Sequence, residues 1–241
     1  MPTAIWAHRG ASAYAPENTL EAIELALRMG ADGIELDVHR TRDGKLVVIH
    51  DETVDRTSNG SGYVKDMTCA ELKKLDFSNG FEKYRGARIP TLKEVYGMLR
   101  STQALINVEI KCDRVIYQGI CDDLTKLAHE MGVSDRIIYS SFNHYMLMEC
   151  RKAAPSARIG LLYGEALYNA WEYAHMLGAD ALHPPYTVAL QAPGFIRNCR
   201  NARIAINTWT VDDEDAIRLL AASNVNAIIT NRPDIAKKAI N

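Results

Sequence analysis

Short apolar runs rich in β-branched residues alternate with helix-like segments along the whole chain, and this alternation limits the possible folds more than any other feature. The runs cover residues 5–8, 33–39, 46–50, 104–110, 136–141, 158–162, 181–183, 204–208 and 227–230. Strands that alternate with helices cannot pair as hairpins, because each helix must carry the chain back to the same end of the sheet. The pattern therefore predicts parallel strands covered by helices.

Signals for the two ends of helices support this reading. Asn18, Thr68 and Thr91 each stand three residues before a glutamate, which is the spacing of a capping box. Four other residues close a helix-like segment just before an apolar run, where the left-handed conformation that ends many helices is expected. They are Gly30, Gly132, Gly178 and Asn224.

The spacing of these helix ends indicates how many units the chain contains. Gly132, Gly178 and Asn224 are equally spaced, at a distance that suits two strand–helix units each time. The interval from Gly30 to Gly132 is more than twice as long, so an insertion is expected there, at about residues 51–88. About eight strands in roughly 250 residues are typical of a (β/α)8 TIM barrel. We therefore expect an α/β protein, with residues 1–241 forming a single TIM-barrel domain that carries a small insertion after the second strand.

An open, doubly wound parallel sheet is the alternative architecture. Many sheets of that kind bind dinucleotides through a G-x-G-x-x-G turn after the first strand. The first run here is followed by His8-Arg9-Gly10 instead, which lacks that pattern. The closed barrel is therefore favoured.

Composition excludes several classes of function. The 241 residues are 47% hydrophobic and 24% charged, as in ordinary globular proteins. The net charge of −2 argues against a nucleic-acid partner, because such proteins need a basic surface. No apolar run approaches the roughly 20 residues that cross a bilayer, and the start shows no secretory signal. The 5 scattered cysteines suggest free thiols, and a cytoplasmic protein is expected.

Ionisable residues stand at the ends of the predicted strands, where the active site of a barrel lies. Glu35 and Asp37 share one face of a strand, and Glu109 ends the next regular strand along the chain. Three oxygen ligands without a neighbouring cysteine suit one hard divalent cation, Mg2+ or Ca2+. The alternative is a salt-bridge network in which these carboxylates pair with Arg9, Arg40 and Lys111.

Histidines follow two of the runs. His8 and His50 are placed to face each other across a bound group, and a pair that titrates near neutral pH suits acid–base work on the two sides of a phosphorus atom. An isolated histidine at either position is more typical of a hydrogen-bonded core residue, whereas the pair flanked by carboxylates favours the catalytic reading. His39 shares the face of Glu35 and is a weaker candidate ligand, and His183 is a further candidate for the mouth.

Basic and aromatic residues complete the predicted mouth. Arg9 and Lys111 suit the binding of phosphate oxygens, Arg9 through its fork and Lys111 through its point charge. Trp209 stands at a strand end and suits a wall for an apolar or glycerol group, although a single aromatic is nearly as often a packing residue.

These residues also carry a resemblance to a known family. The chain resembles the glycerophosphodiester phosphodiesterases from residue 8 to about residue 233, with every motif in order. The motifs are His8-Arg9-Gly10, Pro16-Glu17-Asn18-Thr19, Glu35-Leu36-Asp37-Val38, Asp43-Gly44, Val48-Ile49-His50-Asp51, Asp55-Arg56-Thr57, Gly60 and Gly62, Glu109-Ile110-Lys111, Trp209-Thr210-Val211-Asp212 and Thr230-Asn231-Arg232-Pro233.

The resemblance implies a barrel and a metal-dependent hydrolysis of a small-molecule glycerophosphodiester to sn-glycerol 3-phosphate and an alcohol. It implies one divalent cation on Glu35, Asp37 and Glu109, and an acid–base pair formed by His8 and His50. It also implies that Arg9 and Lys111 contact the phosphate. Our hypothesis assigns His8 as the base and His50 as the acid. The attacking group is either water or the glycerol hydroxyl of the substrate.

Three other functions compete with this one. A barrel hydrolase of C–N bonds usually begins with two histidines one residue apart, whereas this chain has His8-Arg9-Gly10. A phospholipase-like phosphodiesterase acting on lysolipids needs an apolar rim or a basic surface, and neither is clear in the sequence. A catalytically silent binder of glycerophosphodiesters is disfavoured by the intact set of acids and histidines.

Overall fold

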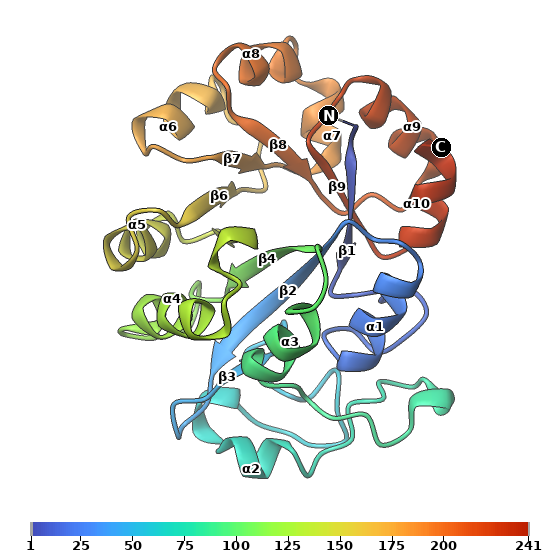
Figure 1. The fold of residues 1–241 in the computed structure, drawn as a ribbon, viewed down its shortest axis with the longest axis vertical. Helices are drawn as coiled ribbons and strands as arrows, with labels where there is room; N and C mark the ends of the chain where they lie inside the picture. Colours follow the sequence, from blue (N-terminus) through green and yellow to red (C-terminus); the bar gives the residue numbers. More distant parts are fainter. Residues whose placement is uncertain (1, 241) are drawn as a thin grey trace.

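Eight parallel strands close into a ring in the computed structural model, which describes residues 2–240 (Figure 1). Around the ring, the strand order is β1, β9, β8, β7, β6, β5, β4, β2, and β2 pairs again with β1. The strands are β1 (Ala4–His8), β2 (Gly33–Arg40), β4 (Leu105–Ile110), β5 (Ile137–Ser141), β6 (Arg158–Leu162), β7 (Ala181–His183), β8 (Ala205–Thr208) and β9 (Ala227–Thr230). The closure of β1 on both β2 and β9 confirms the TIM barrel and excludes the open sheet.

Helices surround the ring on its outside (Figure 1). They are α1 (Leu20–Arg28), α2 (Cys69–Leu72), α3 (Leu92–Leu99), α4 (Ile120–Met131), α5 (His144–Ala153), α6 (Ala170–Met176), α7 (Tyr186–Gln191), α8 (Phe195–Asn201), α9 (Glu214–Ala222) and α10 (Pro233–Ile240), with short 3-10 turns η1 (Val64–Asp66), η2 (Glu82–Tyr84) and η3 (Ser134–Arg136). None of the helices within residues 2–240 is long and apolar enough to span a bilayer.

Two of the three predicted capping boxes are present. The side chains of Thr68 and Thr91 each accept a hydrogen bond from the backbone N–H of the glutamate three residues on, and the threonine N–H donates to the side chain of that glutamate. The prediction at Asn18 is wrong, because the side chain of Thr19 caps α1. Asn18 instead adopts a left-handed backbone and turns its amide toward the barrel interior.

The predicted helix ends are also confirmed. Gly30, Gly132, Gly178 and Asn224 have φ angles of 81°, 67°, 63° and 56°. Glycine adopts this left-handed conformation without the strain that a Cβ atom brings, and asparagine tolerates it better than most residues. The periodic Gly/Asn pattern in the sequence therefore reports the end of one strand–helix unit and the start of the next.

The ninth strand lies outside the ring. β3 (Leu46–Val48) runs antiparallel to β2, with Val48 opposite Val38. The expectation that residues 46–50 form a strand of the parallel ring is therefore wrong. A short turn at Gly44 sends the chain back along the carboxyl-terminal half of β2, and this return brings His50 to the mouth.

The chain between β3 and α3 forms a small layer of its own beside the barrel (Figure 1). Its apolar side chains bury one another in a cluster separate from the main core. The cluster contains Val47, Ile49, Val54, Val64, Leu72, Phe77 and Ile89. Burial of this cluster fixes the segment that follows β3 against the barrel.

Inside the barrel, two large aromatic side chains, Trp6 and His183, each require glycine as a neighbour. A Cβ atom at Gly33 would lie 2.7 Å from the Trp6 indole, and one at Gly160 would overlap the imidazole of His183. These rings fill the barrel interior below the mouth, and Trp6 packs edge-on against His183 with ring centroids 6.3 Å apart. The two glycines make this packing possible.

Gly160→Ala is therefore expected to destabilise the barrel, because the buried His183 cannot yield without moving its own neighbours. We expect a loss of about 1–3 kcal/mol in the free energy of unfolding, as for other overpacked cores. Gly164→Ala is the matched control, since a Cβ there meets nothing within 4 Å. Urea unfolding of both variants checks the prediction, and equal stabilities would contradict it.

Candidate active site

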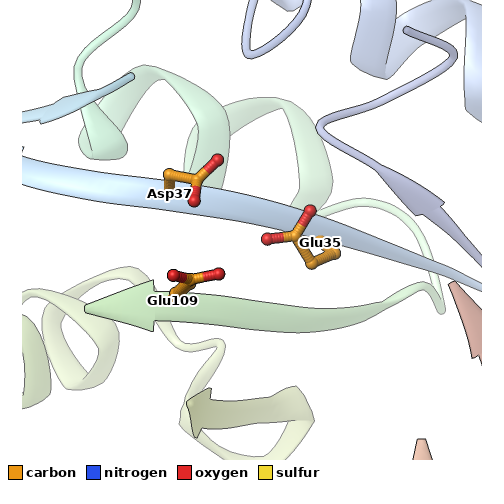
Figure 2. Close-up of side chains that lie close together, drawn as sticks. All are labelled: Glu35, Asp37 and Glu109. Carbon is orange, nitrogen blue, oxygen red and sulfur yellow. The ribbon is translucent and has the colours of Figure 1, made fainter. Parts of the chain in front are cut away.

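Three carboxylates from two neighbouring strands meet at the mouth of the barrel. Glu35 and Asp37 point to the same side of β2, and Glu109 on the adjacent β4 lies opposite Asp37 in the register (Figure 2). One oxygen atom of each lies within 4.8 Å of the others. The side-chain atoms Glu35 Oε1 and Asp37 Oδ1 are buried without a hydrogen-bond partner among the described residues. Buried carboxylate oxygens of this kind need a cation or a proton.

The pKa values of the three carboxyl groups are shifted in different directions. Burial, together with Asp37 and Glu109, raises the pKa of Glu35 well above its ordinary value. Burial and the charge of Asp37 raise the pKa of Glu109 to about 7. Burial alone would raise the pKa of Asp37 too, but Arg9, His50 and Lys111 hold that pKa well below its usual range. The cluster therefore carries more negative charge than its own surroundings can neutralise.

Two cations border the cluster. Arg9 Nε lies 3.3 Å from Asp37 Oδ2, and its Nη1 donates to Glu17 at 2.9 Å. Lys111 Nζ donates to Glu109 Oε1 at 2.7 Å and lies 3.9 Å from Asp37 Oδ1. The third expected member of a salt-bridge network is absent from the cluster, because Arg40 pairs with Asp123 at 3.0 Å. Two cations thus face two buried carboxylates and the half-buried Glu109.

The tautomer of His8 follows from its neighbours. Asn231 Nδ2 donates to Asp212 Oδ2 at 2.6 Å, which turns the Asn231 carbonyl oxygen toward His8 Nδ1 at 2.7 Å. A carbonyl only accepts, so Nδ1 carries the hydrogen and Nε2 keeps its lone pair. Nε2 faces the carboxylates, 4.0 Å from Glu35 Oε2. Burial and the charge of Arg9 lower the pKa of His8 to about 4.

His50 is held differently, by a charged partner. Its Nδ1 donates to Asp51 Oδ1 at 2.6 Å, and Arg56 Nε donates to the other oxygen of Asp51 at 2.7 Å. Against the effect of burial, Arg56 and His50 lower the pKa of Asp51 to about 2. Asp51 is therefore a carboxylate at all ordinary pH values, and it offers His50 a compensating negative charge.

The two weaker histidine candidates lie elsewhere. His39 is buried behind the site, where its ring nitrogens bond to the Tyr117 hydroxyl at 2.9 Å and the His50 carbonyl at 3.1 Å. His183 is buried in the barrel, where Nε2 pairs with the Asn207 amide at 2.9 Å. The oxygen cluster that could hold a metal does not include either residue.

A pocket of about 90 Å3 opens above the carboxylates. Its walls include both histidines of the predicted pair, together with Arg9, Glu35, Glu109 and Trp209. The Trp209 indole donates to the His183 carbonyl at 2.7 Å and packs edge-on against Phe142. Lys111 lies just outside this wall, with Nζ 3.3 Å from His50 Nε2. The structure thus brings all eight predicted site residues to one place.

Comparison with known proteins decides the family. The model of the glycerophosphoryl diester phosphodiesterase family matches residues 8–235. A glycerophosphodiester phosphodiesterase of Caldanaerobacter subterraneus subsp. tengcongensis is 46% identical over 235 residues, which cover 97% of this chain and 96% of that protein. The chain belongs to the glycerophosphoryl diester phosphodiesterase family.

Solved structures of the family agree with this placement. A glycerophosphodiester phosphodiesterase from Agrobacterium tumefaciens is 33% identical, has a TM-score of 0.86, and is matched over 98% of this chain and 99% of its own. A phosphodiesterase from Oleispira antarctica, solved with the product sn-glycerol-3-phosphate, is 26% identical with a TM-score of 0.90, over 99% and 97% of the two chains. The resemblance found in the sequence is confirmed, and the chain is an enzyme of this family.

Sequence reasoning missed the residues that hold the site residues in place. Asn18 Nδ2 donates to Asp37 Oδ2 at 2.8 Å. Asn231, Asp51 and Arg56 stand inside the family motifs, so the motifs marked them, but no periodicity or spacing assigned them a partner. The contact of His8 with Asn231 joins residues 223 positions apart, which no local pattern reveals.

The structural role of His183 predicts a pH dependence of stability. Burial lowers the pKa of His183 from 6.5 to about 3. Between these values the unfolded chain binds a proton that the folded chain does not, so the free energy of unfolding falls as the pH falls. The slope is up to about 1.4 kcal/mol per pH unit from this residue.

His183→Gln removes the titrating group, so we expect its free energy of unfolding to depend less steeply on pH between pH 6 and pH 4 than that of the parent. Urea unfolding at several pH values measures the slope. His129→Gln, at an exposed helical histidine, is the matched control and should keep the parent slope. A His183→Gln slope equal to that of the parent would refute this role.

Proposed function

We propose that the enzyme hydrolyses glycerophosphodiesters to sn-glycerol 3-phosphate and an alcohol in the pocket above Glu35, Asp37 and Glu109. The observation that carries the proposal is the placement of two differently held histidines, an arginine and three buried carboxylates around one small pocket. The product named for the Oleispira antarctica structure supports the same reaction.

One divalent cation, Mg2+ or Ca2+, fits the carboxylate cluster. The unpartnered oxygens of Glu35 and Asp37, with Glu109 beside them, are hard oxygen donors of the kind these ions prefer. Three carboxylates with one divalent ion leave a charge of about −1, which Arg9 and Lys111 bring to about +1, so a phosphodiester anion neutralises the site. When bound, the cation supplies Lewis-acid stabilisation of the phosphate oxygens.

Arg9 and Lys111 bind and orient the phosphate in this proposal. Arg9 is held by Glu17 and Asp37, with its side chain at the pocket wall. A guanidinium fixed in this way presents its remaining N–H groups without losing further side-chain freedom. Lys111 lies between Glu109 and His50, just outside the pocket wall, and adds a point charge there. Both stabilise the charge that develops on the phosphate oxygens.

His8 acts as the base and His50 as the acid. The lone pair of His8 Nε2 faces the pocket, and a pKa of about 4 leaves the ring neutral and ready to accept a proton from the attacking hydroxyl. His50 Nδ1 is hydrogen-bonded to the Asp51 carboxylate, whose negative charge balances a second proton on the imidazole ring. His50 then donates that proton to the departing alcohol. Trp209 and Phe142 form the apolar wall beside the glycerol.

The reaction and its metal requirement are tested together. The enzyme is first stripped with chelator, and release of sn-glycerol 3-phosphate from glycerophosphocholine and glycerophosphoethanolamine is then measured with Mg2+, with Ca2+ and with neither. We expect release only with a divalent ion. Glu109→Gln should lower turnover by at least about a hundredfold, because it removes a ligand and a negative charge together. Full activity in chelator would refute the metal, and binding without turnover would identify a silent binder.

The two histidine roles separate with an activated leaving group. p-Nitrophenolate needs little protonation as it departs. With a p-nitrophenyl phosphodiester as substrate, His50→Gln should therefore lose far less activity than with glycerophosphocholine. His8→Gln should lose about 10²–10⁴-fold on both substrates, because the base acts on the attacking hydroxyl in either case. His129→Gln is the control for an exposed histidine. A rescue of His8→Gln by the activated ester would reverse the assignment.

A further inference from the structure

A second cavity lies at the opposite end of the barrel from the active site. It holds about 810 Å3 and opens among the amino-terminal ends of β5, β6, β8 and β9. That volume lies within the range of small-molecule sites in proteins. The glycerophosphodiester reaction makes no use of this end of the barrel.

Small side chains at this end leave the interior open. Ala4, Ala181 and Ala205 line the cavity from three strands, where barrels usually place bulky branched residues. Trp6 and Ile138 line the apolar interior beside them. Trp6 is 5% exposed, and its indole N–H has no hydrogen-bond partner among the described residues. The interior therefore offers an apolar slot beside the Trp6 indole, which suits a flat ring.

Four arginines form the rim of this cavity. They are Arg136, Arg158, Arg200 and Arg203. Within residues 2–240, none of them forms a salt bridge with a carboxylate, whereas Arg9, Arg56 and Arg218 all do. The only acidic residue among the described lining residues is Asp180, which already pairs with Arg151 at 2.9 Å. The rim thus carries four positive charges against one negative charge.

Three of these arginines are fixed by backbone carbonyls. Arg136 Nη1 donates to the carbonyl of Thr102 at 2.9 Å, Arg158 Nη2 to that of Asp135 at 2.8 Å, and Arg200 Nη2 to that of Ser223 at 2.8 Å. Each guanidinium has five N–H donors, so several stay free on every one. Neutral carbonyl partners hold the groups in place and leave their charges uncompensated. Such a rim matches the oxygens of phosphate groups.

We propose that this cavity binds an organic polyphosphate, with a flat ring in the slot between Trp6 and the alanines and the phosphates on the arginine rim. Nucleoside di- and triphosphates have this composition. A ligand with a single carboxylate would leave most of the positive charge of the rim unbalanced. A diphosphate carries about the negative charge needed to balance it. The site is independent of the carboxylate cluster at the other end of the barrel.

Calorimetric titration of the full chain with ADP tests the proposal. Chelator is present throughout, so that a metal in the active site cannot hold the phosphates. We expect one ADP per chain, bound at least tenfold more tightly than either adenosine or pyrophosphate, because each of these fills only half of the site. Excess glycerophosphocholine should not displace it. Absence of binding at millimolar ADP, or displacement by glycerophosphocholine, would overturn the proposal.

Variants of the exposed arginines locate the site. Arg203 is exposed, and within residues 2–240 its side chain forms no salt bridge, so Arg203→Met should fold normally and bind ADP about tenfold more weakly. Arg200→Met should weaken ADP binding to a similar extent. Arg197→Met is the matched control, because Arg197 is exposed on the same helix, α8, and does not line the cavity. An equal loss in Arg197→Met would show nonspecific attraction and would refute a built site.

Discussion

The burial of three carboxylates at the mouth of one barrel is the constraint on which the rest of the site depends. Glu35, Asp37 and Glu109 lie on adjacent parallel strands, whose register forces their side chains together. Their partial or complete burial limits their solvation, so their repulsion must be met by cations or by protonation. Arg9 and Lys111 meet part of it, and the raised pKa values of Glu35 and Glu109 show what is left over. The same imbalance that would destabilise a purely structural cluster supports the proposed binding of a divalent ion and, beyond it, of an anionic substrate.

Much of this architecture could be predicted because it is encoded locally. Apolar runs, capping boxes at Thr68 and Thr91, and left-handed residues such as Gly178 depend on neighbours a few positions away. Parallel strands also gather their carboxyl ends at one edge, so residues at those ends could be assigned to one mouth without knowing their contacts. Asn18 shows the limit of such reasoning. Its spacing to Glu21 is that of a helix cap, yet the buried Asp37 binds its amide, and the adjacent Thr19 caps the helix instead.

Contacts between distant segments could not be predicted in the same way. The antiparallel return of β3 depends on the turn after β2 and on a separate apolar cluster, and alternation alone does not distinguish such a strand from a member of the ring. The partner of His8 is a second case. His8 is held by the neutral amide of Asn231, far away in the sequence, whereas His50 is held by the charged Asp51 beside it in the chain. The surroundings of the two histidines therefore differ through a tertiary contact that the spacing of His8 and His50 does not reveal.

The position of β3 outside the ring also explains why the site needs the segment that follows it. His50 has no ring strand to hold it, so it depends on the apolar packing of Val47 and Ile49 and on the His39 imidazole beneath its carbonyl. Arg56 completes the support. It bonds to Asp51, the partner of His50, and to Glu17, the partner of Arg9, and so connects His50 to Arg9 through two carboxylates. These ion pairs join the segment that follows β3 to the barrel. The placement of His50 and Arg9 therefore depends on the insertion as well as on the barrel.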